Sequence, residues 1–403
     1  MTSKTPIEAT EPDRAAPAYV MSAALAVTTA SVLPVFLFGG LAVQMADDIH
    51  LTPSIIGWAS GLYFTSAGAT SILAGRLVEK WGATRCAFIG VGLAALCLLS
   101  IGLFVDNRFA LIAVMVLAGP ANGFGQLSSN AYLSRWAPVR HKGLFFGVKQ
   151  AAIPLCTFIT GLSVPAIALV YGWRAAFVLA AAASVCAMFL IRRFHGPSER
   201  AGRSVGQPVR DRRLILMMLV ALCGAIAATS LGPFLATYAV AEGNSRHFAG
   251  ILLLSGGFAG IVARTVVGGV ADRWRGGELN LTIVMMGGGI IGTVLLAIST
   301  TPLIIVGTVF GFALGWAWPG LHNLATTKRY AQQPGAATGF TQTGVYLGGA
   351  IGPIGFGAVV EYVGWTAAWL MSSSLFILAI ALLWAVKRIE TSHGDSPRSD
   401  NAG

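Results

Sequence analysis

Two positively charged side chains lie inside long apolar stretches of this 403-residue chain. Lys149 falls in the stretch 143–169 and Arg264 in 248–271, whereas the 16 acidic residues fall in tails, in loops or at the ends of such stretches. A cation in an apolar membrane interior costs roughly 2.5–3.5 kcal/mol on insertion scales, and such residues usually serve a function. Since no carboxylate lies at comparable depth, we expect a small anion from outside the chain to neutralise both cations. Arginine can hold a carboxylate through two parallel hydrogen bonds, and lysine adds a mobile point charge.

A second interpretation places both charges at the surface. Along a helix, Arg264 lies about 6 Å from Gly268 and Lys149 about 9 Å from Gly143. Both long side chains could then extend to the nearby surface and keep their charges in water. Burial and hydrogen-bond partners distinguish the two interpretations.

Polar side chains recur every four residues in three other apolar stretches, which places each set on one face of a helix. They are Asn122, Gln126 and Asn130 in 109–133, Trp318, His322 and Thr326 in 302–327, and Gln342 and Tyr346 in 336–360. We predict that the cargo is oriented by Asn122, Gln126, Gln150, Trp318, His322, Gln342 and Tyr346. The alternative is hydrogen bonding between helices, worth about 0.6 kcal/mol for each contact. His322 could also exchange a proton near neutral pH, although a lone histidine is more often simply hydrogen-bonded.

The elements that must hold these residues are membrane-spanning helices. The sequence is 55% hydrophobic and only 11% charged, against about 25% charged residues in soluble proteins. About twelve stretches are long enough to cross an apolar core of roughly 30 Å. They are 19–45, 52–74, 85–105, 109–133, 143–169, 174–191, 214–241, 248–271, 279–299, 302–327, 336–360 and 364–386. We therefore predict an all-α integral membrane protein with twelve transmembrane helices in a lipid bilayer.

The two halves of the chain repeat each other at an offset of about 192 residues. Gly143 corresponds to Gly335, Gln150 to Gln342, and Gly172-Trp173 to Gly364-Trp365. A duplication of this size predicts two pseudo-symmetric six-helix bundles that rock about a site between them. The predicted parts are an N-terminal tail (1–18), a first bundle (19–192), a central loop (193–213), a second bundle (214–388) and a C-terminal tail (389–403).

The basic residues predict the orientation. Of the 27 Lys and Arg, only Arg108, Arg174 and Arg246 fall in loops after odd-numbered stretches. Since basic loops stay cytoplasmic, we expect both tails and the central loop to be cytoplasmic, in a plasma membrane such as a bacterial inner membrane. The net charge of +11 then reflects topology, and we expect no nucleic-acid partner. We expect the chain to act as a monomer.

Two loops carry a recognisable signature. Gly75-x-x-x-Glu79-Lys80-x-Gly82-x-x-Arg85 follows the second stretch, and Gly268-x-x-x-Asp272-Arg273 follows the eighth. Together with the repeat, they make the chain resemble a major facilitator superfamily carrier over essentially its whole length. Glu79 stands where aspartate is usual, and Gly276 comes one residue late. In that family these residues help to hold the cytoplasmic side shut. The resemblance therefore implies gating roles for Gly75, Glu79, Arg85, Gly268, Asp272 and Arg273, and the alternative is ordinary loop charge.

The segment around Arg264 carries a narrower resemblance. Ile261-Val-Ala-Arg264-x-x-x-Gly268 is similar to the eighth span of monocarboxylate carriers, whose arginine binds the substrate carboxylate, and oxalate/formate exchangers have a comparable arginine. Two departures matter: Gly260 stands where the monocarboxylate carriers place an aspartate, and the first stretch, around Pro34, lacks their lysine. The resemblance thus implies an anionic cargo without specifying which one, and Lys149 is a candidate for the second positive role.

The sequence favours one function and leaves two rivals. The favoured function is secondary transport of a small organic anion, by symport with protons or by exchange for a counter-anion. The rivals are an exporter of drug-like amphiphiles and, in another class, a non-transporting membrane sensor or scaffold. The chain has no Gly-x-x-x-x-Gly-Lys-Ser/Thr phosphate loop, and its five cysteines show no CxxC spacing. We therefore expect neither an enzyme nor a cofactor or metal site.

Overall fold

The computed structural model describes residues 17–136, 142–191, 211–271 and 277–392, and these residues form helices joined by short connections. The first half contains α1 (Pro17–Ile49), α2 (Pro53–Trp81), α3 (Ala83–Phe104), α4 (Arg108–Trp136), α5 (Lys142–Gln150), α6 (Ala152–Ser163), the π-helical turn η2 (Val164–Ala168), α7 (Leu169–Tyr171) and α8 (Trp173–Ile191). The second half contains α9 (Arg212–Thr229), α10 (Leu231–Ala241), α11 (Arg246–Ala271), α12 (Glu278–Ala297), α13 (Thr301–Phe310), the π-helical turn η3 (Gly311–Gly315), α14 (Trp318–Arg329), α15 (Pro334–Tyr362) and α16 (Trp365–Ser392). The predicted tails and central loop fall largely outside the described residues.

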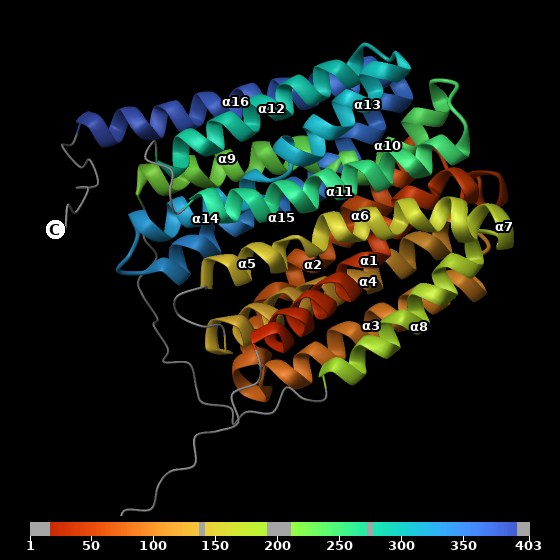
Figure 1. Cartoon of the computed structure of the whole chain (residues 1–403), viewed down its shortest axis with the longest axis horizontal. Helices are drawn as coiled ribbons and strands as arrows, with labels where there is room; N and C mark the ends of the chain where they lie inside the picture. Colours follow the sequence, from red (N-terminus) through yellow and green to blue (C-terminus); the bar gives the residue numbers. More distant parts are fainter. Residues whose placement is uncertain (1–16, 137–141, 192–210, 272–276, 393–403) are drawn as a thin grey trace, which may run out of the picture.

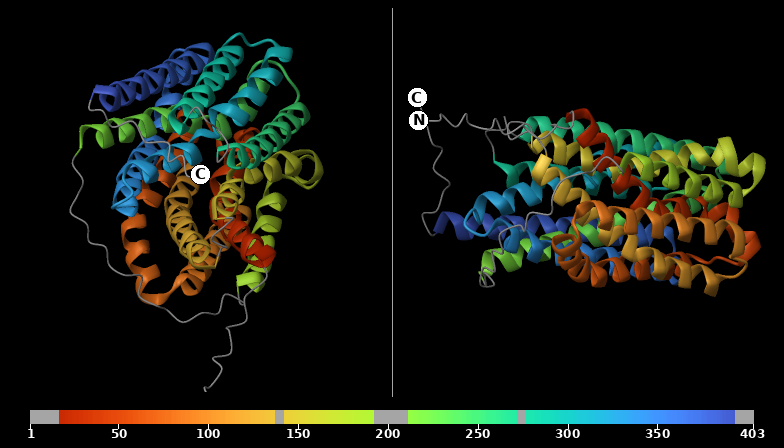
Figure 2. Two further views of the ribbon diagram at one scale, coloured as in Figure 1. Left: turned by 60° about the vertical axis from the view of Figure 1, so that its left-hand side comes forward. Right: turned by 90° about the horizontal axis from the view of Figure 1, so that it is seen from below.

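The helices run alongside one another in two groups, α1–α8 and α9–α16, which lie one above the other in Figure 1 and are also distinct in the left view of Figure 2. Across the boundary, α2 packs on α15, α6 on α11, and α1 on α10. Within the described residues, ten segments are long and apolar enough to cross a membrane. Two more complete the predicted number: α8, whose apolar part is shorter, and α2, in which Gly, Ser and Thr stand among the apolar residues. The predicted all-α membrane architecture is confirmed, and a count of twelve is consistent with it.

Three of the predicted spans, 143–169, 214–241 and 302–327, are not the continuous helices that we expected. In the first two, an α-helix ends four residues before a proline, and in the third the π-helical turn η3 does. The pairs are Gln150 and Pro154, Thr229 and Pro233, and Gly315 and Pro319. Proline has no amide hydrogen to donate to the carbonyl four residues earlier, so the hydrogen-bond ladder opens at that point. Pro34, Pro120 and Pro353 lie inside the continuous helices α1, α4 and α15, so a proline permits an interruption without requiring one.

Close approach between helices explains part of the glycine content. Gly344, Gly348 and Gly352 recur every four residues along the face of α15 that packs on α9. A Cβ atom at Gly348 would lie 2.6 Å from both the Leu222 carbonyl oxygen and the Ala225 Cβ atom. Small residues that let helix backbones meet are a main source of packing energy in membranes.

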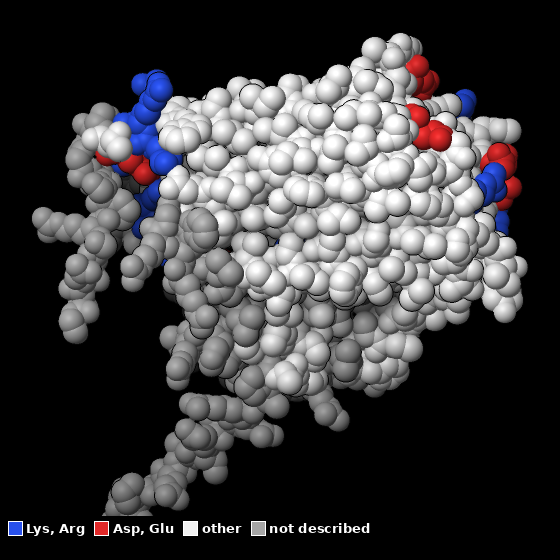
Figure 3. Space-filling view, turned by 45° about the horizontal axis from the view of Figure 1, so that its top comes forward, with Lys and Arg blue, Asp and Glu red and all other residues white. Residues whose placement is uncertain are grey.

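On the face shown in Figure 3, charged side chains gather at the two ends of the molecule and leave a largely uncharged band between them. We call the end where Ile191, Arg212 and Ser392 lie the terminal end, and the end where α1 connects to α2 the opposite end. This distribution suits a bilayer, whose apolar core excludes charge.

Two polar contacts join the bundles at the opposite end. Arg246 Nη2 lies 2.9 Å from Asp47 Oδ2, and the Ser54 amide donates to Glu361 Oε2 at 2.9 Å. The first pair is largely exposed, so it contributes little energy by itself. Its significance is geometric, because it places α1 beside the start of α11.

Candidate functional site

Arg264 is buried between the two bundles and bonded to main-chain oxygens. Its side chain, 8% exposed, extends from α11 and donates from Nη1 to the Gln150 carbonyl oxygen at 2.5 Å and from Nη2 to the Trp316 carbonyl oxygen at 2.6 Å. Its guanidinium carbon also lies 5.9 Å from the centroid of the Trp316 ring. Gln150 belongs to the first bundle and Trp316 to the second, so one side chain connects both.

Both acceptor carbonyls lie where a helix is interrupted. Gln150 is the last residue of α5, and its ordinary helical donor would be the amide of residue 154, which is a proline. Trp316 lies between η3 and α14, with φ −114° and ψ 2°. A buried carbonyl without a donor costs free energy comparable to a lost hydrogen bond, so these positions present acceptors that Arg264 satisfies. Sequence reasoning missed Pro154 and Trp316, although the four-residue spacing from Gln150 to Pro154 was a usable signal.

Lys149 has a different environment, although it precedes Gln150 in the chain. Its side chain is only 1% exposed, and Nζ donates to Oε1 of Gln126 in α4. The helical stripe on α4 therefore does bring a polar side chain to the buried cation. Surface extension is excluded for both Lys149 and Arg264 by their burial.

Neither cation has an acidic partner among the described residues. The acceptors found for Lys149 and Arg264 are an amide oxygen and two carbonyl oxygens. These neutral oxygens satisfy donors but leave the positive charges uncompensated. The expectation that the chain provides no carboxylate for them concerns the whole sequence and stays a prediction.

His322 and Trp318 lie together within the second bundle. Their ring centroids are 5.8 Å apart in an edge-to-face arrangement, and both side chains are 1% exposed. The Trp318 indole lies against Gly224 of α9, close to Met286 of α12. Within the described residues, no hydrogen-bond partner is found for Trp318 Nε1, whereas the His322 ring lies within hydrogen-bonding reach of the Met217 main chain. Direct contact of this pair with a cargo stays a prediction.

The other predicted binding residues occupy separate places. Asn122 is buried in α4, and no partner is found for its Oδ1 atom within the described residues. Gln342 is half-buried in α15. Tyr346, one turn further along α15, packs against Gly68 of α2 at the contact between the bundles. Their role in binding is untested.

The gating residues of the first half lie at the terminal end. Gly75 and Glu79 are in the last two turns of α2, and Arg85 is in the first turn of α3, with the side chains of Glu79 and Arg85 exposed. Gly82, between the two helices, has φ +86°, a conformation that favours glycine. Gly268 lies in the last turns of α11, whereas Asp272 and Arg273 lie outside the described residues. Their gating roles stay predictions.

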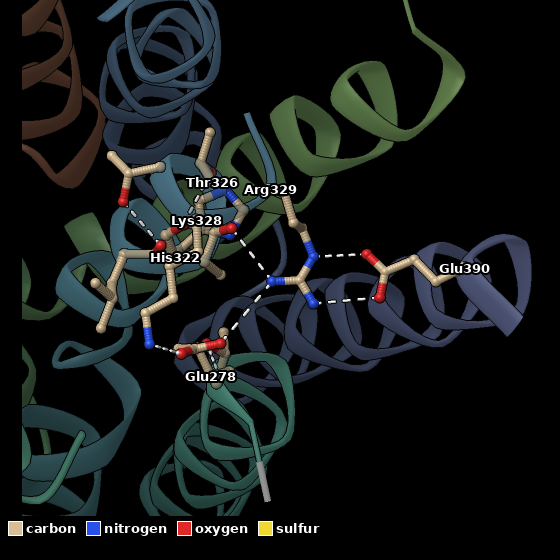
Figure 4. A network of polar contacts seen from close by, with 10 residues as sticks. Glu278, His322, Thr326, Lys328, Arg329 and Glu390 are labelled. Carbon is tan, nitrogen blue, oxygen red and sulfur yellow. Dashed lines mark hydrogen bonds and ion pairs between the residues drawn. The ribbon is translucent and has the colours of Figure 1, made fainter. Parts of the chain in front are cut away.

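Charges at the terminal end of the second bundle are paired, unlike the two buried cations. Figure 4 shows Arg329 bonded to both carboxylate oxygens of Glu390, at 2.6 and 3.2 Å, with Glu278 on its other side. Lys328 also contacts Glu278 at 2.5 Å. These contacts connect the ends of α12, α14 and α16.

A second terminal-end contact joins α9 to the end of α14. Partial burial raises the pKa of Asp211, but hydrogen bonds from the Arg213 amide, the Tyr330 hydroxyl and the Arg213 guanidinium outweigh it, so the pKa lies below its ordinary value. Burial, followed by the hydrogen bond to Asp211, raises the pKa of Tyr330. The pKa of Asp211 is lowered and that of Tyr330 is raised, so both shifts move the groups away from titration near pH 7.

Comparison with known proteins places this geometry in context. The model of the Major Facilitator Superfamily matches residues 21–353 and 217–402. The multi-drug resistance efflux pump PmrA of Streptococcus pneumoniae is 26% identical over 340 residues, which cover 79% of this chain and 82% of that protein. The probable sulfoacetate transporter SauU of Cupriavidus necator is 23% identical over 358 residues, which cover 79% of this chain and 81% of that protein.

A solved structure supports the fold alone. The crystal structure of the nucleoside transporter NupG, in a point-mutant form, superposes with a TM-score of 0.69 at 15% identity and covers 90% of this chain and 99% of that one. At this identity the similarity concerns the arrangement of helices and carries no information about cargo.

Proposed function

Because the chain belongs to the major facilitator superfamily and is a membrane transporter rather than an enzyme, we propose that it is an alternating-access secondary carrier of a small organic anion, most simply a carboxylate. The observation that carries this proposal is the pair of buried cations, Lys149 and Arg264, whose partners in the described residues are neutral oxygens. A carboxylate of the cargo would supply the missing negative charge. Gln126 and Gln150 lie beside these cations and would orient the cargo.

The relatives are compatible with this class of cargo. SauU is named as a probable transporter of sulfoacetate, which is a small organic anion. We extend the class, not the compound, to this chain. The remaining predicted contacts, Asn122, His322, Trp318, Gln342 and Tyr346, belong to the proposal as side chains that the cargo would reach in some state of the transport cycle.

Orientation and coupling complete the proposal. We place the terminal end in the cytoplasm of a plasma membrane because most of the basic residues fall, in the sequence, in the tails and in the loops after even-numbered spans. The contacts between Asp47 and Arg246 and between Ser54 and Glu361 then close the outer side. Uptake of a lone anion opposes an inside-negative potential by about 2.3 kcal/mol per 100 mV, so uptake would require proton symport or anion exchange.

A second candidate is export of drug-like amphiphiles, which is favoured by the similarity to the efflux pump PmrA. An amphiphile would be held mainly by apolar and aromatic surface, of which Phe36, Phe312 and Trp316 form a buried cluster beside Arg264. This candidate does not require the two cations to contact the cargo.

Transport in proteoliposomes separates the two candidates. Uptake of radiolabelled lactate and oxalate should be measured with and without a pH gradient or an internal counter-anion, beside the neutral analogue lactamide.

Arg264→Ala should weaken acid binding roughly 30-fold or more, since truncating one member of a buried charge pair costs at least about 2 kcal/mol. Arg264→Lys should weaken it less because the charge remains, and the exposed Arg108→Ala should behave as wild type. Equal affinity of the wild type for acid and amide would reject the anion assignment.

A further inference from the structure

The two hydrogen bonds of Arg264 indicate a role beyond binding the negative charge of the cargo. A guanidinium whose only role was to bind the cargo would need no contact with the first bundle. Arg264 nevertheless donates from Nη1 to the Gln150 carbonyl in the first bundle and from Nη2 to the Trp316 carbonyl in the second. We propose that Arg264 is a clasp between the bundles, and that the anionic cargo opens it by replacing the Gln150 carbonyl. This inference rests on the proposed function and describes how cargo binding would be coupled to movement of the bundles.

The relative strength of the acceptors favours displacement. A carboxylate carries the charge opposite to the guanidinium and can accept two parallel hydrogen bonds from it, whereas each carbonyl oxygen is neutral and accepts one bond from it here. The side chain of Arg264 is 8% exposed and both terminal nitrogens are already bonded. A carboxylate that binds Nη1 and Nη2 in the parallel, two-bond arrangement therefore competes with the carbonyl oxygens that now accept from these nitrogens.

The Gln150 carbonyl is the acceptor whose loss has a mechanical consequence. It ends α5, and Pro154 leaves it without a helical donor. Once Arg264 turns to the cargo, this partly buried carbonyl loses its partner, and the closed arrangement of α5 against α11 is destabilised. The cargo thereby binds one arrangement of the bundles better than the other, which is the condition for a ligand to shift a conformational equilibrium.

Pro154 provides a direct test. Pro154→Ala restores an amide at residue 154 that can donate to the Gln150 carbonyl, so Arg264 is held less tightly and the carboxylate meets less competition. We expect the dissociation constant of the purified carrier for lactate and oxalate to fall about fivefold, the factor of one net backbone hydrogen bond. The matched control is Pro165→Ala, in the same span and also beside α11 at Gly250, which should leave the affinity unchanged. Unchanged or weakened binding in Pro154→Ala, or the same gain in both variants, would overturn the clasp while leaving the anion assignment in place.

A second measurement requires no ligand. Hydrogen–deuterium exchange of the segment 145–156 should be several-fold faster in Arg264→Ala than in wild type, because α5 loses its connection to α11, and Arg108→Ala should show no change. In wild type, saturating lactate should accelerate the same segment. If neither acid binds wild type, the proposed function fails, and the exchange comparison of Arg264→Ala with wild type still decides the clasp. Equal exchange in these two proteins would reject it.

Discussion

At the scale of single residues, the two buried cations differ in geometry and in the number of acceptors that hold them, which suits them to different roles. Arg264 is a rigid fork that spans two carbonyls, whereas Lys149 is a single ammonium held by one flexible amide side chain. An ammonium on a four-carbon chain can follow a moving charge more easily than a guanidinium can. Lys149 is therefore the better candidate for a charge that accompanies the cargo.

Replacement of Lys149 by methionine separates the anion carrier from the amphiphile exporter. We expect Lys149→Met to abolish uptake of labelled lactate and oxalate, with thermal stability within about 1 kcal/mol of wild type. Removal of a buried charge offsets the loss of the donor to Gln126, since apolar replacement of buried ions is often neutral or stabilising. The readouts are proteoliposome uptake and melting in detergent. An exporter would retain efflux of a dye such as ethidium in this variant.

Which charges are buried could be predicted from the sequence, but their partners could not. Lys149 and Arg264 are conspicuous because apolar residues surround them, and the stripe through Gln126 pointed to a polar helix face. The partners of Arg264, in contrast, are main-chain carbonyls, and a carbonyl is present at every residue. Only the helix interruptions make those at Gln150 and Trp316 available, so the site depends on backbone geometry that composition does not reveal.

At the scale of helices, prolines and glycines determine where the chain departs from regular packing. The prolines that follow Gln150, Thr229 and Gly315 by four residues interrupt three spans that hydropathy alone presents as continuous. Apolar length predicts that a segment crosses the membrane, and a missing amide hydrogen weakens the helix at one point. The helices α1, α4 and α15 nevertheless continue past Pro34, Pro120 and Pro353. Hydropathy therefore predicts approximate spans, which are consistent with the observed helices, whereas the points at which the backbone changes from one helix to the next could not be predicted from it.

Two glycines of α15 give a matched test of close packing. Gly348 faces α9 with no room for a side chain, while a Cβ atom at Gly355 would meet nothing within 4 Å. We expect Gly348→Ala to destabilise the protein by about 1–3 kcal/mol through overpacking. Gly355→Ala should raise stability by about 0.5–1 kcal/mol, since alanine is the better helix former. Melting of the two purified variants measures both effects, and equal shifts would show that α15 does not depend on contact with α9.

At the scale of the whole molecule, the internal repeat was the most informative feature of the sequence. Glycines and glutamines that recur at half the chain length predicted two similar bundles, and the observed fold has this arrangement. The repeat does not reveal which ends of the bundles are in contact, because alternating states share the same sequence and differ only in a few contacts. In this structure those contacts include Asp47 with Arg246 at the opposite end.

A cross-link between positions 47 and 246 tests alternating access directly. With the exposed Cys186 replaced by serine, the pair Asp47→Cys and Arg246→Cys can be joined by a short bis-methanethiosulfonate, which links the two thiols through reducible disulfides. If the bundles must separate at the opposite end to complete a cycle, as rocking about a central site requires, the cross-link should stop lactate uptake. Binding of lactate from the terminal end should persist in detergent, and reductive cleavage of the link should restore uptake.

The unlinked double variant should transport nearly normally, because an exposed ion pair adds little stability. Undiminished uptake by the fully linked protein would show that the opposite end does not open, and would exclude rocking of the two bundles as the transport mechanism.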